Sequence, residues 1–169
     1  MNKVMILSMV LILLGCGAGV SDFTQDLGNG YVFESFGQDL KNIRTPVPGQ
    51  KDIYGKVVQY VYDKNDILVI QQPNKKIYRN ILGEEIISKN RSKYPNHSID
   101  DIREGQRIAD SLIMYDPYYR KIFAHKINYW IISHKNKQIY GPLTEEEYYH
   151  KRKDLNVSRE LQFDNDEKQ

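Results

Sequence analysis

The stretch GKVVQYVYDKNDILVIQQP, residues Gly55–Pro73, decides how this chain folds. Two runs rich in β-branched and aromatic residues, Lys56–Tyr62 and Ile67–Gln71, flank the four polar residues Asp63–Asp66. The pattern predicts a β-hairpin with a four-residue loop, because Asp and Asn favour turns and the flanking residues favour strands. Both faces of the first run are largely apolar, which indicates a central hairpin covered on both sides.

A second hairpin is predicted in NYWIISHKNKQIYGP, residues 128–142. Its strands are Tyr129–Ser133 and Gln138–Tyr140, joined by a polar loop. Tyr31–Phe36 is a further predicted strand, and Asn42–Thr45 is a short one that the following prolines end. The expected fold class is α+β: a small, mainly antiparallel sheet of two β-hairpins plus one or two strands, packed with two or three helices.

The residues between the hairpins predict helices. Ile77–Ser88 carries apolar residues at helical spacing. Ser98 and Asp101 resemble a capping box that starts a second helix, and Asp116-Pro117 is typical of the start of a third. Gly105 is expected to weaken the second helix by about 1 kcal/mol relative to Ala. The side chains of that helix expected to face a core are Ile99, Ile102, Ile108, Leu112 and Ile113.

The segment GPLTEEEYY, residues 141–149, is the most site-like stretch, because three adjacent carboxylates beside tyrosines suggest acid–base chemistry or a metal. The spacing favours a structural explanation. Thr144 and Glu147 match a capping box, and Leu143 and Tyr148 match a hydrophobic staple. The acidic first turn and the basic last turn also suit the helix dipole. We therefore expect these residues to start and orient one helix.

The N-terminus predicts where the protein resides. Lys3 precedes a largely apolar run of 11 residues, shorter than the roughly 20 that span a bilayer, and this layout is typical of a secretory signal peptide. Leu13-Leu14-Gly15-Cys16 resembles the lipobox of bacterial lipoproteins. The resemblance implies cleavage before Cys16 and acylation of Cys16 by membrane lipid, with chains such as palmitate. Gly17 in place of an aspartate favours the outer membrane, if the cell has one.

These features divide the chain into four parts. Residues 1–15 are the expected lipoprotein signal peptide, and residues 16–29 are a flexible tether of small and polar residues. Residues 30–162 form a single α+β domain with a helical insert at about 75–126. Residues 163–169 are an expected disordered tail.

Composition argues against several classes of function. Basic and acidic residues are interleaved and the formal net charge is +2, so there is no single-sign field to bind nucleic acid. One cysteine allows no internal disulfide. The four histidines are scattered, and no metal, cofactor or nucleophile motif occurs, so we expect no metal, no cofactor and no catalytic residue. The 13 tyrosines suit half-buried strands, or else a stacking surface for sugar or protein partners.

The C-terminal hairpin carries a further resemblance. Tyr129-Trp130-Ile131-Ile132, a lysine-rich turn and Tyr140-Gly141-Pro142-Leu143 before an acidic helix start resemble the mark of a family of small bacterial lipoproteins of unknown function. The lipobox and an early Gly30-Tyr31 fit the same family. The residues between the hairpins depart from it, being longer and more helical. The resemblance implies a location and an architecture, and it implies no catalytic residues.

The sequence leaves three hypotheses of function. The first is a lipid-anchored, extracytoplasmic, non-catalytic binding or scaffold module with an envelope protein or glycan as partner. The second is an inhibitor or immunity-type lipoprotein that occludes a toxin or hydrolase. The third is an envelope hydrolase with a site that sequence spacing does not reveal. A scaffold predicts an apolar patch, an inhibitor a protruding loop or acidic face, and a hydrolase a pocket with convergent polar groups.

Overall fold

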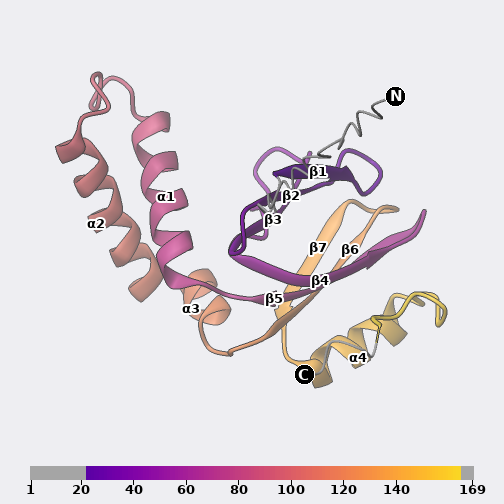
Figure 1. Cartoon of the computed structure of the whole chain (residues 1–169). Helices are drawn as coiled ribbons and strands as arrows, with labels where there is room; N and C mark the ends of the chain where they lie inside the picture. The colour runs from indigo at the N-terminus through magenta and orange to yellow at the C-terminus, as the bar shows by residue number, and fades with distance from the viewer. Residues whose placement is uncertain (1–21, 165–169) are drawn as a thin grey trace, which may run out of the picture.

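The computed structural model describes residues 22–164, in which seven strands form one sheet and four helices pack against it (Figure 1). This confirms the predicted α+β class, with one more helix and one more strand than expected. The strands are β1 Phe23–Asp26, β2 Val32–Phe36, β3 Leu40–Arg44, β4 Lys56–Tyr62, β5 Asp66–Gln72, β6 Asn128–Ser133 and β7 Gln138–Leu143.

The sheet consists of two antiparallel parts joined at one narrow point. Strand order follows chain order from β1 to β7, and every neighbouring pair is antiparallel except β3 and β4. Those two are parallel and are paired only at Lys41 and Lys56. The first part bends over the second, which brings the side chain of Gln25 on β1 into hydrogen-bond contact with the hydroxyls of Tyr60 and Tyr62 on β4.

Both predicted hairpins are present. In the first, a side-chain oxygen of Asp63 accepts hydrogen bonds from the backbone N–H groups of Asn65 and Asp66, which closes the loop. β5 lies between β4 and β6, and its residues 67–69 are fully buried on both faces. Coverage on both sides is therefore confirmed for β5, but it is wrong for the end of β4, where Tyr62 is 41% exposed.

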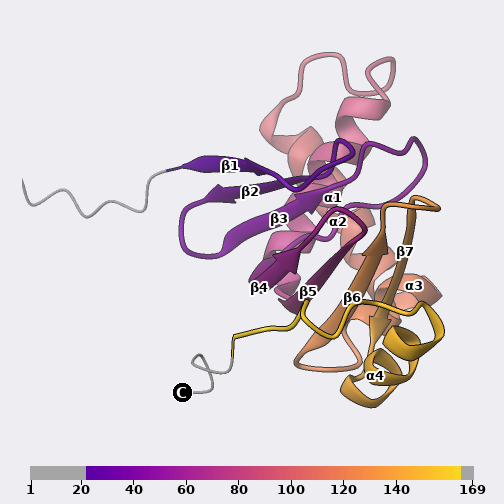
Figure 2. The same cartoon turned by 90° about the vertical axis from the view of Figure 1, so that its right-hand side faces the viewer.

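The helices cover the two faces of the sheet unequally. α1 Lys75–Lys89, α2 Ile99–Tyr115 and α3 Pro117–Ile122 lie between β5 and β6 in the chain, and α4 Glu145–Asp154 follows β7. Figure 2 shows α1, α2 and α3 behind the sheet and α4 in front of it. The larger core lies on the side of α1–α3, and a smaller one forms around Tyr148 of α4.

The predicted helix starts are confirmed in detail. Ser98 and Asp101 form a capping box at the start of α2, and Thr144 and Glu147 form another at the start of α4. A side-chain oxygen of Asp116 accepts the backbone N–H of Tyr118, with Pro117 as the first residue of α3. These caps satisfy N–H groups that a helix cannot bond internally.

The structure corrects several boundaries. The tether predicted over 16–29 is wrong at its end, because β1 and the fully buried Leu27 lie within it. The tail predicted from residue 163 is wrong at its start, since Phe163 packs against the core around Tyr148. The core position predicted for Ile99 is also wrong, because the first turn of α2 leaves it 69% exposed. Residues 16–21 of the tether and 165–169 of the tail lie outside the described residues.

Gly105 has a packing role that helix propensity does not reveal. α1 and α2 cross closely there: a Cβ added at Gly105 would lie 2.6 Å from the carbonyl oxygen of Gly83 and 2.8 Å from Cδ1 of Ile87. The local cost of a glycine in a helix is thus accepted because a larger residue would push the two helices apart.

The buried side chain of Gln71 connects four segments of the fold. Its amide nitrogen donates to the carbonyl of Tyr54 and to the hydroxyl of Tyr78 on α1. Its amide oxygen accepts from Nδ2 of Asn128 and from Nε1 of Trp130 on β6, at 3.2 and 3.0 Å. Gln71 is 0% exposed, and all four hydrogen bonds of its amide are made within the protein.

We expect Gln71→Leu to lower the free energy of unfolding by about 3 kcal/mol or more, because several buried polar groups would lose their partner. The measurement is urea unfolding of the full chain in non-ionic detergent. Gln72→Leu is the matched control, since that side chain is exposed. Equal midpoints for the two variants would contradict a central role for Gln71.

Candidate functional site

A cleft of about 630 Å³ lies between the β3–β4 connection and the helices α1, α2 and α3. Its apolar part comes from the helices and includes Leu82, Ile86 and Leu112. Its polar part comes from the connection and from the last turns of α1. The lining groups of that polar part are Gln50, Lys51, Asp52, Tyr54, Glu85, Lys89 and Asn90.

The β3–β4 connection, residues 45–55, is held in place by its own polar groups. The backbone N–H of Thr45 donates to Oδ1 of Asp52 at 2.8 Å, and the hydroxyl of Thr45 donates to Oε1 of Gln50 at 3.1 Å. The amide of Gln50 donates to the carbonyl of Lys137 in the β6–β7 turn. Ile53 pairs with Ile43 through two backbone hydrogen bonds and is fully buried. The wall of the cleft is therefore preformed.

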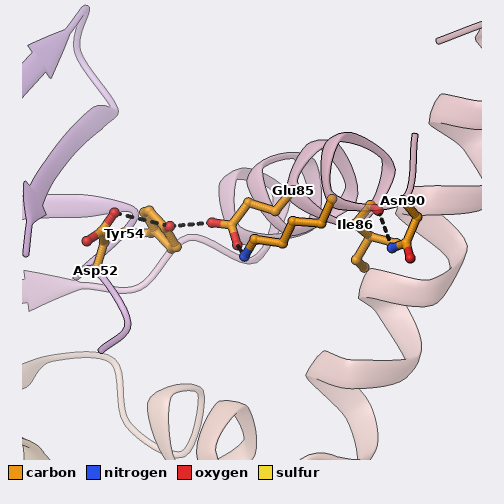
Figure 3. Close-up of polar contacts among 6 residues, drawn as sticks. Asp52, Tyr54, Glu85, Ile86 and Asn90 are labelled. Carbon is orange, nitrogen blue, oxygen red and sulfur yellow. Dashed lines mark hydrogen bonds and ion pairs between the residues drawn. The ribbon is translucent and has the colours of Figure 1, made fainter. Parts of the chain in front are cut away.

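Two carboxylates meet at one tyrosine in the cleft. Figure 3 shows the hydroxyl of Tyr54 between Asp52 and Glu85, 3.3 Å from Oδ2 of Asp52 and in a shorter hydrogen bond with Oε1 of Glu85. The second oxygen of Glu85 accepts from Nζ of Lys89 at 2.9 Å. The three side chains come from segments that are distant in the sequence.

The protonation states of Asp52, Tyr54 and Glu85 determine how these three side chains interact. Burial raises the pKa of Tyr54, so the phenol keeps its single proton and donates it to Glu85. The same hydroxyl also lies in donor position 3.3 Å from Oδ2 of Asp52, and this contact lowers the pKa of that carboxyl. Burial also raises the pKa of Asp52, which outweighs the hydrogen bond from the Thr45 N–H that lowers it. The arrangement therefore favours a protonated Asp52 at acidic pH.

An aromatic corner closes one end of the cleft. The rings of Tyr118 and Tyr119 at the start of α3 lie 5.2 Å apart at 80° to one another. Nζ of Lys51 lies 4.2 Å from the centroid of each ring. Burial raises the pKa of Tyr119 to about 12 and raises that of Tyr118 as well, so both rings stay neutral.

The residues singled out in the sequence lie elsewhere. Cys16 is outside the described residues. The GPLTEEEYY segment forms the cap of α4, where the backbone N–H of Thr144 lowers the pKa of Glu147. His97 contacts Glu84 near the α1–α2 turn, and His134 packs against Tyr31. Within residues 22–164 no three metal-binding side chains come together, and no helix there is long and apolar enough to cross a membrane.

Sequence reasoning missed the cleft residues for a physical reason. Asp52 and Tyr54 lie in a proline-flanked connection, and Glu85 lies on a helix more than 30 positions later, so no short motif relates them. The local pattern of each segment is ordinary. The sequence offers one indication of the cleft: the turn-like connection 45–55 contains polar and aromatic residues.

The C-terminal third of the chain matches a known family model. The model describes a family of proteins of unknown function (DUF3997) and matches residues 110–167. The matched segment runs from the second half of α2 through α3, β6, β7 and α4, and it contains Tyr118, Tyr119 and the predicted YWII and YGPL motifs. This is consistent with the uncharacterised family expected from the sequence. Comparison with curated proteins and with solved structures finds no match.

The raised pKa of Asp52 predicts a pH dependence. The folded protein binds this proton more tightly than the unfolded chain, whose Asp has the ordinary pKa of 3.8. The stability that the group contributes is therefore fully present below that value and is lost as pH rises through the raised pKa. Asp52→Asn cannot titrate. We therefore expect the free energy of unfolding of Asp52→Asn to rise relative to that of the wild type as the pH increases above the ordinary Asp pKa of 3.8.

Urea unfolding at a series of pH values measures this difference. Asp39→Asn, which removes an exposed carboxylate, corrects for the loss of one negative charge. A difference between Asp52→Asn and wild type that stays constant over the pH range would show that Asp52 is not held protonated in the cleft.

Proposed function

We propose that this protein is a lipid-anchored, non-catalytic binding module of the bacterial envelope that takes its ligand in the cleft between residues 45–55 and helices α1–α3. The observation that carries the proposal is the cleft itself. It combines an apolar floor with convergent polar groups on preformed walls, which is the usual make-up of a ligand site. Its volume of about 630 Å³ suits a small molecule or a few residues of a partner chain.

A binding role fits the chemistry of the cleft better than catalysis. The described residues that line it include no serine, cysteine or histidine. Its two carboxylates, Asp52 and Glu85, are bridged by Tyr54, and Glu85 is also paired with Lys89. Such mutual pairing leaves neither carboxylate directed at a reacting atom and instead rigidifies the wall.

The anchor is the part of the proposal that rests on the sequence. We expect Cys16→Ala to abolish acylation and signal cleavage, because the thiol is the acceptor of lipid in the lipobox that Leu13–Cys16 resembles. Membrane fractionation measures attachment. The mass of the N-terminal peptide measures cleavage, and metabolic labelling with a fatty acid measures acylation. Ser8→Ala, within the apolar run, is the control. Unchanged cleavage and labelling of Cys16→Ala would overturn the anchor.

The inhibitor hypothesis has one observation in its favour. The α1–α2 hairpin projects away from the sheet (Figure 1), and its tip, residues 90–98, is exposed except at Tyr94. A projecting, partly rigid element of this kind can enter the active site of an enzyme. In that case the tip, and not the cleft, would carry the contact with the partner.

A matched pair of charge reversals distinguishes the two hypotheses. Lys89→Glu reverses a charge that lines the cleft, and Arg91→Glu makes the same change two residues later, at the exposed tip. We expect Lys89→Glu to reduce recovery of a specific partner or ligand at least about fivefold, because a charge at a binding surface selects its partner. Arg91→Glu should leave recovery unchanged.

The measurement is crosslinking in intact cells followed by quantitative mass spectrometry of the tagged protein. Loss with Arg91→Glu alone would favour the inhibitor. Equal recovery from wild type and both variants would contradict both the cleft and the tip as binding sites. Circular dichroism of each variant checks that the fold is retained.

A further inference from the structure

The ammonium of Lys51 lies in the corner between two tyrosine rings. Its Nζ lies 4.2 Å from the centroids of both Tyr118 and Tyr119. Because the two rings stand at 80°, they form a corner that presents two π faces to one point. Such faces attract ammonium groups through the ring quadrupole.

Few other interactions hold Lys51 in this corner. Among residues 22–164 its ammonium forms no ion pair within 4.0 Å, and the residue as a whole is exposed. The two ring contacts are therefore the interactions that place this ammonium. Asp52 and Asp116 are close enough to affect the pKa of Tyr118, which burial chiefly raises. A flexible, exposed side chain in such a position can leave without breaking the fold.

Lys51 also separates two cavities. Together with Gln50 it lines both the cleft of about 630 Å³ and a neighbouring cavity of about 350 Å³. The second cavity is lined by Tyr118 and by Trp130. Tyr119 lines the cleft and Tyr118 lines the second cavity, so the aromatic corner lies where both cavities border Lys51.

We propose that the Tyr118–Tyr119 corner is an ammonium-binding site, and that Lys51 is its built-in occupant, which the primary or quaternary ammonium group of a ligand displaces. The exchange replaces one cation by another, so the net charge beside the two rings is kept. The inference rests on the proposed function, since the ligand reaches the corner through the same cleft.

Removal of the occupant should strengthen binding. In the wild type the ligand must first displace Lys51, and the apparent affinity is reduced by the fraction of molecules in which the corner is free. In Lys51→Ala the corner is always free. We therefore expect Lys51→Ala to bind choline about tenfold more tightly than the wild type does.

The test titrates the full chain, purified in non-ionic detergent, with choline and with 3,3-dimethylbutan-1-ol, its uncharged isostere. Isothermal titration calorimetry gives the affinities. Trp130, the sole tryptophan of the chain, lines the second cavity and supplies a fluorescence signal. Lys93→Ala is the matched control, because Nζ of Lys93 lies 4.9 Å from the ring of Tyr94 but at the hairpin tip.

Support for the inference would be tighter choline binding by Lys51→Ala than by wild type and Lys93→Ala, with no such gain for the uncharged isostere. Tyr118→Leu in the Lys51→Ala background should remove the gain. Equal affinity of Lys51→Ala and wild type for choline, no measurable choline binding, or equal binding of the two probes would overturn it. Loss of partner recovery with Lys89→Glu would still support the cleft in that case, so the two proposals fail separately.

Discussion

The amide of Gln71 is the constraint on which the rest of the structure depends. It is fully buried, and its four hydrogen bonds reach the β3–β4 connection, α1 and two residues of β6. A buried polar group that finds all its partners in one arrangement excludes alternative arrangements, because each would leave a donor or acceptor unpaired. The same amide holds the backbone of Tyr54 while the hydroxyl of that residue reaches the two carboxylates of the cleft.

The cleft follows from an irregularity in the sheet. Because β3 and β4 are joined at a single pair, the chain between them crosses toward the helices instead of forming a tight turn. Residues 45–55 thereby face α1 and α3 across a space that no side chain fills completely. Gln50 and Ile53 fix this crossing through hydrogen bonds to neighbouring segments, and Thr45 does so through a hydrogen bond to Asp52 within the connection. A weak join in the sheet and a firmly held connection together make a preformed binding surface.

The charged groups around the cleft differ in how many partners they have within the protein. Glu85 has the Tyr54 phenol and Lys89 as partners, whereas Asp52 accepts from the Thr45 N–H and the Tyr54 hydroxyl, and burial still raises its pKa. Lys51 relies on two aromatic faces. Lys51, which has no ion pair among the described residues, lies at the aromatic corner. A ligand could therefore replace its ring contacts there without breaking an ion pair of the protein. These differences in pairing connect the proposed binding role of the cleft with the proposed ammonium site.

Local sequence patterns determined the elements and many of their ends. Runs of β-branched and aromatic residues around polar loops predicted both hairpins. The caps at Ser98, Asp116 and Thr144 predicted three helix starts, because hydrogen bonds within a few residues control these features. The α+β class followed from the order of these elements. The position and lipid chemistry of Cys16 remain predictions of sequence alone.

Only the tertiary structure decided what the elements bring together. β1 was missed because its short, polar sequence is a strand solely through pairing with β2, and the value of Gly105 became visible only where α1 crosses α2. Asp52, Tyr54 and Glu85 meet because the sheet bends and Gln71 draws a distant connection onto α1. Contacts of this kind depend on packing between segments far apart in the chain, and no short-range pattern encodes them.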